Sequence, residues 1–234
     1  MQRAMNLEVE KDETITDRLP CESLSEDFVG FNDIKLSSTH PRGEVLFEEG
    51  QAPRGVYVLC SGRAKVSITS SEGKTVILRL AKPGDLLGVN SVLKGLPYDS
   101  TVETLERSRI DFVQRADFLK LIDKSKAARV GVTKTLGNEL SDVVEHARLL
   151  LLSQNAQEKL VRLLLNWCDE LGEPTPEGIR LNHGLTNEEI AQMICGSRET
   201  VSRLFTQLKE KQVVRLNPSG VLLCYRAALK SVLR

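Results

Sequence analysis

The spacing of apolar residues in this chain changes once, after Gln114, from the pattern of short strands to the pattern of helices. The segments before and after this point are each compatible with only a few folds. Between about Thr39 and Phe112 the apolar residues form short runs separated by glycines, and Ser71–Lys74 has the composition of a hairpin turn. Many short strands at this spacing predict an antiparallel β-barrel or jelly roll. The predicted strands cover residues 45–47, 55–60, 64–68, 75–80 and 108–113.

Beyond Gln114 the pattern is helical. A short helix is predicted near Phe118, and a proline-free helix follows from Ala127 to about Gln154. Within the longer helix, apolar residues repeat at the spacing of a heptad seam: Leu136, Leu140, Val143, Ala147 and Leu150. A seam of about two heptads suits the pairing of two subunits, so we expect a dimer helix. In the alternative interpretation, the same stripe packs on its own barrel.

The last third of the chain predicts a winged helix-turn-helix. A helix is expected over about Gln157–Leu171, followed by a loop over Gly172–Gly178 and a short strand over Ile179–Leu181. Two helices joined by a tight turn come next, and residues 213–225 have the pattern of a β-hairpin.

Two signals locate the helix-turn-helix. Residues Thr186–Glu189 form a capping box, in which the Thr hydroxyl accepts from the third backbone amide and the glutamate reaches back. Residues Cys195–Ser197 then supply the turn, with Gly196 expected to take a positive φ and Ser197 expected to cap the next helix. We therefore predict a second helix over residues 197–209.

The second helix has two chemically different faces. Its apolar residues share one side: Val201, Leu204, Phe205 and Leu208. The opposite side carries Glu199, Ser202, Arg203 and Thr206, and Arg198 lies at the exposed amino end. Arginine can donate two parallel hydrogen bonds to guanine and glutamate can accept from cytosine, so this face suits the major groove of DNA. Glu199 and Arg203 also have the spacing of an ordinary surface ion pair, which is the alternative without a DNA role.

The net charge of zero conceals an asymmetry along the chain. Residues 1–30 contain three Lys or Arg against eight Asp or Glu, a net charge of −5, whereas residues 179–234 contain nine against four, a net charge of +5. A basic carboxy-terminal region suits a polyanionic partner. No apolar run approaches the roughly 20 residues of a membrane span, and no secretory signal is present. We expect a cytoplasmic protein with no membrane association.

The cysteines and histidines predict neither a metal site nor a catalytic site. The cysteines lie far apart without a CxxC pair, and we interpret most of them as small buried residues: Cys21, Cys60, Cys168, Cys195 and Cys224. The histidines are isolated from one another: His40, His146 and His183. No spacing matches a nucleophilic triad or a phosphate-binding glycine loop, so we do not expect an enzyme.

Two segments carry a resemblance to a known family. Residues 185–192 read LTNEEIAQ and residues 196–204 read GSRETVSRL, which closely resembles the DNA-binding domain of the cyclic-AMP receptor protein and FNR (Crp/Fnr) family of bacterial transcription regulators. Residues 83–88, PGDLLG, resemble the barrel motif of that family. The resemblance implies an α+β fold in four parts: an acidic segment (1–30), a cyclic-nucleotide-binding-type jelly-roll barrel (31–126), a dimerisation helix (127–154) and a winged helix-turn-helix (155–234).

The resemblance also implies roles for individual residues. Base contacts would come from Arg198, Glu199, Ser202 and Arg203, and phosphate contacts from Thr186, Ser197 and Thr200. A homodimer would read a pseudo-palindrome with half-sites about 34 Å apart. The motif Arg-Glu-x-x-Ser-Arg mixes features of two subtypes of the family, and we favour a TGTGA-like half-site over TTGAT. Contact with RNA polymerase is a further implication of the family.

The barrel departs from the pattern of the cyclic-AMP-binding members. Val89 stands where those members carry a ribose-binding glutamate, and Asp99 and Ser100 stand where they carry an arginine and a serine for the cyclic phosphate. A carboxylate repels a phosphate, and the arginine fork is missing. An ungapped count places Val144 and Glu145 where adenine-contacting hydroxyls occur. We therefore do not expect cyclic AMP as the effector, and the pocket candidates are Gly88, Val89, Asp99, Ser100, Val144 and Glu145.

No other cofactor is predicted either. Oxygen-sensing members hold an iron-sulfur cluster with several amino-terminal cysteines, whereas only Cys21 lies in that region here, as a bystander or a redox thiol. Two functions remain: a homodimeric regulator that senses another signal or none, and a small-molecule or redox binding module in which DNA binding is secondary. The intact face with Arg198, Glu199 and Arg203 favours the regulator.

Overall fold

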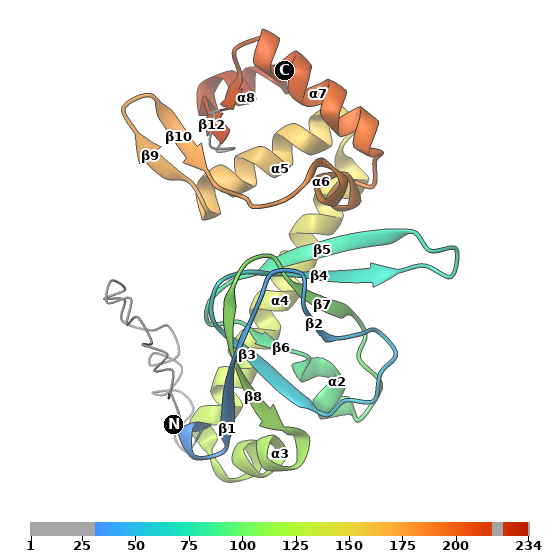
Figure 1. Cartoon of the computed structure of the whole chain (residues 1–234), viewed down its shortest axis with the longest axis vertical. Helices are drawn as coiled ribbons and strands as arrows, with labels where there is room; N and C mark the ends of the chain where they lie inside the picture. The colour runs from blue at the N-terminus through green and yellow to red at the C-terminus, as the bar shows by residue number, and fades with distance from the viewer. Residues whose placement is uncertain (1–30, 217–221, 234) are drawn as a thin grey trace, which may run out of the picture.

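The computed structural model describes residues 31–216 and 222–233. Figure 1 shows a β-barrel in the lower half of the view and a second domain in the upper half, with the long helix α4 (Lys126–Leu152) running along the barrel towards that domain. The acidic segment 1–30, and with it Cys21, lies outside the described residues.

The barrel consists of two four-stranded antiparallel sheets, ordered β1-β8-β3-β6 and β2-β7-β4-β5, which confirms the predicted barrel-type domain. A short 3-10 helix, η1 (Phe31–Asp33), precedes it, and helix α2 (Val89–Lys94) lies between β6 and β7. The strands are β1 (Lys35–His40), β2 (Val45–Phe47), β3 (Gly55–Ser61), β4 (Ala64–Thr69), β5 (Thr75–Ala81), β6 (Leu86–Leu87), β7 (Thr101–Thr104) and β8 (Ser108–Gln114).

The hydrophobic pattern does not predict β1, β6 or β7. Strand β1 is an edge strand whose central residues are exposed, so its sequence lacks an apolar face. Strand β6 has two residues and β7 has four, too few to show a period. Each of these strands forms through backbone pairing with a partner distant in sequence, which a local pattern cannot reveal.

Aromatic stacking and one glycine shape the interior of the barrel. The rings of Phe47 and Tyr98 stack with their centroids 4.0 Å apart, and the Tyr98 hydroxyl donates a 2.6 Å hydrogen bond to the carbonyl oxygen of Gly55. Gly88 lies against this pair with φ +76°, and a Cβ atom there would come within 2.7 Å of the Tyr98 ring. The motif 83–88 therefore needs glycine at its last position, because any other residue would meet both backbone strain and a steric clash.

Two side-chain caps separate the helices between the domains. Helix α3 (Arg115–Lys124) ends at Ser125, whose hydroxyl then accepts from the backbone amide of Ala128 and begins α4. Helix α5 (Ala156–Glu170) begins at Asn155, whose side-chain oxygen accepts from the backbone amide of Glu158 at 2.9 Å. Such caps satisfy backbone donors that have no partner within the helix.

The second domain is a winged helix-turn-helix, as predicted. Its sheet has the strand order β11-β12-β10-β9. The loop predicted over 172–178 is wrong in part, because it contains β9, whose polar residues give no hydrophobic signal but pair with β10. The elements are β9 (Glu173–Thr175), β10 (Gly178–Leu181), α6 (Asn187–Met193), α7 (Arg198–Glu210), β11 (Val214–Leu216), β12 (Leu222–Cys224) and a final helix, α8 (Arg226–Val232), that was not expected.

The two domains share one hydrophobic core. Ile77 and Leu105 of the barrel belong to the same buried cluster as Leu164 of α5 and Ile190 of α6. Packing of β5 against α6 therefore fixes the helix-turn-helix on the barrel. None of the helices that the structure describes is long and apolar enough to cross a membrane.

Candidate nucleic-acid interface and ligand cavity

The predicted capping box is present at the start of α6. The Thr186 hydroxyl accepts from the backbone amide of Glu189 at 3.2 Å, and the Glu189 carboxylate accepts from the backbone amide of Thr186 at 2.8 Å. Burial of Glu189 raises its pKa, but the hydrogen bonds from Thr186 and Lys65 outweigh burial, and the net pKa is lowered. Glu189 is therefore ionised near neutral pH and holds the first turn of α6 in place.

The turn between α6 and α7 differs from the prediction in one residue. Cys195, not Gly196, takes the positive φ, at 53°. The backbone amide of Gly196 bonds the carbonyl oxygen of Ala191 at 2.9 Å, which closes the turn directly after the left-handed residue. Ser197 then caps α7 as predicted, because its hydroxyl accepts from the backbone amide of Thr200 at 3.2 Å.

Helix α7 presents a polar face to solvent. Its four apolar residues are buried against the domain core: Val201, Leu204, Phe205 and Leu208. The four predicted base-contacting residues lie together on the opposite, exposed side, in a shallow hollow that also includes Thr206: Arg198, Glu199, Ser202 and Arg203. Thr206 shares their face, as helical spacing predicts, but was not among the predicted base contacts.

The charged side chains on this face form no ion pair with one another within the described part of the chain. The pKa of Glu199 is lowered by its own backbone amide and by the Ser197 hydroxyl, and the charge of Arg198 adds to this effect. Among the described residues no ion pair joins Glu199 to Arg203, so the ordinary surface pair considered above is not formed. The guanidinium groups of Arg198 and Arg203 consequently have no carboxylate partner on this surface within the described part of the chain.

The three predicted phosphate-contacting residues lie at the amino ends of α6 and α7. Thr186 is the cap of α6, Ser197 is the cap of α7, and the Ser197 and Thr200 hydroxyls are 3.1 Å apart. Backbone amides point outward at such helix ends and attract anions.

Three basic side chains of the barrel hold the segment that leads into α6. Lys65 of β4 donates to Glu189 at 2.9 Å and pairs with Glu103 of β7 at 3.1 Å. Arg63 donates to the carbonyl oxygen of Asn182 at 2.6 Å, and Arg42 donates to the carbonyl oxygen of Gly184 at 3.2 Å. Burial lowers the pKa of Lys65, but the hydrogen bonds to both glutamates outweigh burial and raise it. No local sequence pattern indicates the contacts of these three side chains with residues 182–189, because the contacting residues are more than a hundred positions apart in the chain.

A cavity of about 400 Å³ lies between the barrel and α4. Four of the six predicted effector residues line it: Gly88, Val89, Asp99 and Ser100. The other two do not. Val144 is exposed on α4, and Glu145 lines a different cavity. Three residues of the predicted heptad seam form the α4 wall instead: Leu136, Leu140 and Val143.

The polar groups of this cavity leave no free cation among its described lining residues. Arg79 donates to Asp85 at 2.5 Å and to Glu139 at 2.7 Å, so its guanidinium is paired twice. Asp99 accepts a hydrogen bond from the Asn90 side chain at 2.6 Å. Burial raises the pKa of Glu139, Arg79 opposes the shift, and Asp85 and Asp99 add to it. A cyclic phosphate would therefore meet carboxylates where it needs donors.

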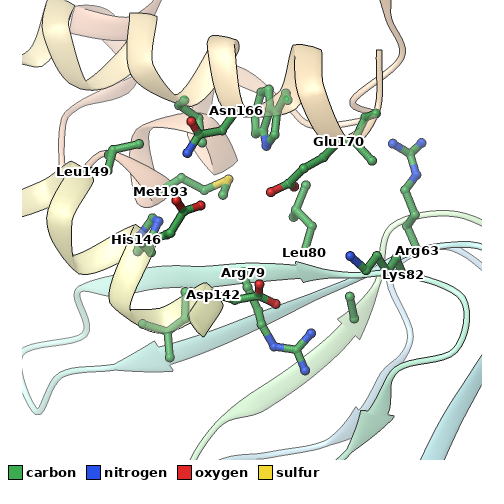
Figure 2. A pocket seen from close by; sticks show the side chains of 16 residues that line it. Arg63, Arg79, Leu80, Lys82, Asp142, His146, Leu149, Asn166, Glu170 and Met193 are labelled. Carbon is green, nitrogen blue, oxygen red and sulfur yellow. The ribbon is translucent and has the colours of Figure 1, made fainter. Parts of the chain in front are cut away.

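A second, smaller cavity of about 100 Å³ separates β5 from α4 and α5 (Figure 2). Figure 2 shows Asp142 and His146 of α4 on one side of it and Asn166 and Glu170 of α5 on the other. Burial raises the pKa of Glu170 and lowers the pKa of His146, whose Nε2 atom has no hydrogen-bond partner among the described residues. The described residues contain no group of three or more His, Cys, Asp or Glu side chains that could hold a metal ion.

The residues of the predicted seam on α4 differ in how far they are buried. Leu136 packs against the barrel core and Leu150 packs against the core of the second domain. Leu140 and Val143, in contrast, remain 65% and 41% exposed, and Ala147 is half-buried. The barrel and the second domain thus cover the ends of the seam but leave its middle open to solvent.

Comparison with known proteins agrees with this architecture. Residues 38–125 match the cyclic nucleotide-binding domain, and residues 158–232 match the Crp-like helix-turn-helix domain. The chain belongs to the Crp/Fnr family of transcription regulators. In this family the helix-turn-helix domain binds DNA, so the exposed face of α7 lies on the DNA-binding domain of a transcription regulator.

Individual Crp/Fnr relatives are distant. The CRP-like cAMP-activated global transcriptional regulator of Mycobacterium tuberculosis is 25% identical over 183 residues, which cover 78% of this chain and 81% of that protein. The transcriptional activatory protein AadR of Rhodopseudomonas palustris is 29% identical over 180 residues, covering 76% and 73%. The solved structure of FixK2 from Bradyrhizobium japonicum has a TM-score of 0.73 at 19% identity and covers 85% of this chain and 96% of that one. At this identity the structural likeness concerns the fold.

Proposed function

We propose that this Crp/Fnr-family chain is a homodimeric, sequence-specific DNA-binding regulator that acts in the cytoplasm and involves no catalytic step. The observation that carries the proposal is the face of α7. Arg198, Glu199, Ser202 and Arg203 are exposed together there, while every apolar residue of the helix is buried. A helix with free arginines at and near its amino end suits the major groove, where arginine pairs with guanine.

The proposed dimer forms along α4. Its exposed Leu140 and Val143 supply apolar area that neither domain of the same chain covers. A twofold axis there would present two α7 helices to one side of the duplex. The proposed target is therefore a pseudo-palindrome with TGTGA-like half-sites about 34 Å apart, with Thr186, Ser197 and Thr200 on phosphates. Contact with RNA polymerase completes the proposal.

The proposed regulator does not use cyclic AMP in the manner of its cyclic-AMP-binding relatives. The cavity of about 400 Å³ has room for a small effector, but its one arginine is paired to two carboxylates and Asp99 adds a third. Titration calorimetry with cyclic AMP should show no heat of binding at this cavity. Saturable binding that Ser100→Ala weakens would contradict this part of the proposal.

Base reading is tested by replacing one arginine at a time. Arg198→Ala should cost about 1–3 kcal/mol of binding free energy on the cognate duplex and should relax the preference at one base pair. The matched control is Arg162→Ala, which removes an exposed arginine of α5 that pairs with Glu158. Fluorescence anisotropy on duplexes with single base-pair changes measures both effects. An equal loss of binding free energy on every duplex would show that Arg198 contacts only the sugar-phosphate backbone of the DNA.

A further inference from the structure

A basic hollow lies at the carboxyl end of α7, beside β11 and α8 (Figure 1). Its volume is about 570 Å³, and no acidic side chain is among the described residues that line it. The sequence predicts none of these residues as a DNA contact. The lining residues are Lys209, Gln212, Val214, Arg215, Tyr225 and Ala228.

The two cations of the basic hollow carry no internal countercharge. Lys209 and Arg215 are both exposed, and within the part of the chain that the structure describes neither forms an ion pair. Arg180, an exposed arginine of the same domain, is in contrast paired with Glu173 at 2.5 Å. The two free cations of the hollow can therefore bind an anion without first giving up a carboxylate.

Uncharged donors complete the lining. The Tyr225 hydroxyl and the Gln212 amide can each donate a hydrogen bond, and neither side chain has a partner among the described residues. Two cations and two neutral donors around one hollow suit an anion with several acceptor oxygens, such as a phosphate group.

The backbone at the end of α7 is already paired. The carbonyl oxygen of Leu208 accepts from the amide of Val213, and the carbonyl oxygen of Lys209 accepts from the amide of Gln212, both at 2.9 Å. Unpaired carbonyl oxygens at the end of a helix repel an anion, so these bonds reduce the opposition of the helix dipole. They also fix the turn that leads from α7 into β11.

We propose that the basic hollow binds a phosphodiester group of the DNA duplex, at the edge of the major groove that α7 enters. This inference rests on the proposed function of α7 in reading bases. Lys209 follows Arg198 by three helical turns, so both lie on the same side of α7, about 16 Å apart along its axis. The major groove is only about 12 Å wide. When Arg198 reaches the base edges, Lys209 therefore lies at the bordering backbone, with Arg215 beside it in the hollow.

The proposed contact has a defined salt dependence. Each phosphate that a protein neutralises adds about 0.9 to the slope of log affinity against log salt concentration, which makes one contact worth about eightfold at 0.1 M salt relative to 1 M. A homodimer has two hollows, so loss of the contact should lower the slope by about 1.8 and raise the dissociation constant at 0.1 M about 60-fold. Because every nucleotide carries the same phosphate, the loss should not depend on sequence.

Fluorescence anisotropy with the full-length protein measures this slope between about 0.05 and 0.5 M salt. The probes are one duplex enriched from a random library and one of unrelated sequence. Lys209→Ala and Arg215→Ala should each lower the slope equally on both duplexes, whereas Arg215→Lys, which keeps the charge, should retain it. The matched control is Arg180→Ala, which removes a positive charge of the same domain that Glu173 already pairs, and it should leave the slope unchanged.

The outcomes separate this contact from the reading of bases. The proposal is overturned if Lys209→Ala and Arg215→Ala both keep the slope of the unmodified protein, or if Arg180→Ala lowers it as much, since the effect would then be one of net charge. Circular dichroism verifies that each variant is folded, and Arg215→Lys decides between charge and packing. If Arg198→Ala still relaxes the base preference, only the phosphate contact is refuted; if the unmodified protein binds neither duplex, the proposed function fails with it.

Discussion

Leu140→Ala tests how the chain dimerises, because Leu140 is the most exposed residue of the seam on α4. Full burial of a leucine side chain is worth about 1.5–3 kcal/mol. Leu140 is 65% exposed in the single chain, so roughly two-thirds of that, about 1–2 kcal/mol, is available per protomer. In a twofold-symmetric dimer both protomers lose this contribution, so the substitution should cost about 2–4 kcal/mol of dimerisation free energy. This cost corresponds to a dimer dissociation constant raised about 30-fold to several hundred-fold.

Sedimentation equilibrium of the purified variant measures this dissociation constant. The matched control is Leu96→Ala, since Leu96 is 57% exposed but lies on the barrel, after α2, and is not part of the seam on α4. It should leave the dimer unchanged. Circular dichroism checks that both variants keep their helices. The reasoning is refuted if Leu140→Ala dimerises like the unmodified chain, or if Leu96→Ala weakens the dimer equally.

Two further predictions concern stability. Thr186→Ala removes the hydroxyl that accepts from the Glu189 amide, so urea unfolding should show a loss of about 1 kcal/mol, whereas Thr186→Ser should lose far less; equal losses would show that the hydroxyl is not the cause. Burial lowers the pKa of both His146 and His183, so these side chains stay neutral in the folded chain while the unfolded chain takes up protons below its ordinary value of 6.5. The histidines therefore leave the free energy of unfolding unaffected above about pH 7 and lower it towards pH 5, by up to about 1.4 kcal/mol per pH unit for each histidine. Urea unfolding at several pH values should show that the free energy of unfolding of His146→Gln falls less steeply with decreasing pH. An unchanged slope would mean that His146 titrates normally.

Local chemistry made the DNA-binding half of the chain predictable. A capping box and a cap at Ser197 are short-range devices, and the spacing of apolar residues on α7 defines its exposed face without reference to other elements. The one local error, Gly196 in place of Cys195 at the left-handed position, came from the general preference of glycine for that conformation. Strand β9 and helix α8 were missed because polar residues in the first and a short length in the second give weak patterns.

The ligand cavity is less predictable from the sequence, because contacts between distant residues form it. The pairing of Arg79 with Glu139 joins β5 to α4, and no spacing in the sequence indicates it. An ungapped count placed the α4 wall at Val144 and Glu145, whereas Leu140 and Val143 line the cavity, so the count was displaced along the helix. The residues of the α4 wall follow from how the helix is rotated against the barrel, which is a property of packing.

Selection of duplexes from a random library by the purified protein, with and without cyclic AMP, tests the central claim most directly. If Arg198 and Arg203 read bases, the protein should enrich a pseudo-palindrome whose half-sites lie one turn of the double helix apart. Addition of cyclic AMP should not change the enriched sequence. Enrichment that requires cyclic AMP would contradict the account of Asp99 and Arg79 in the cavity. The absence of any enriched sequence in either condition would contradict the proposal that the exposed face of α7 reads bases.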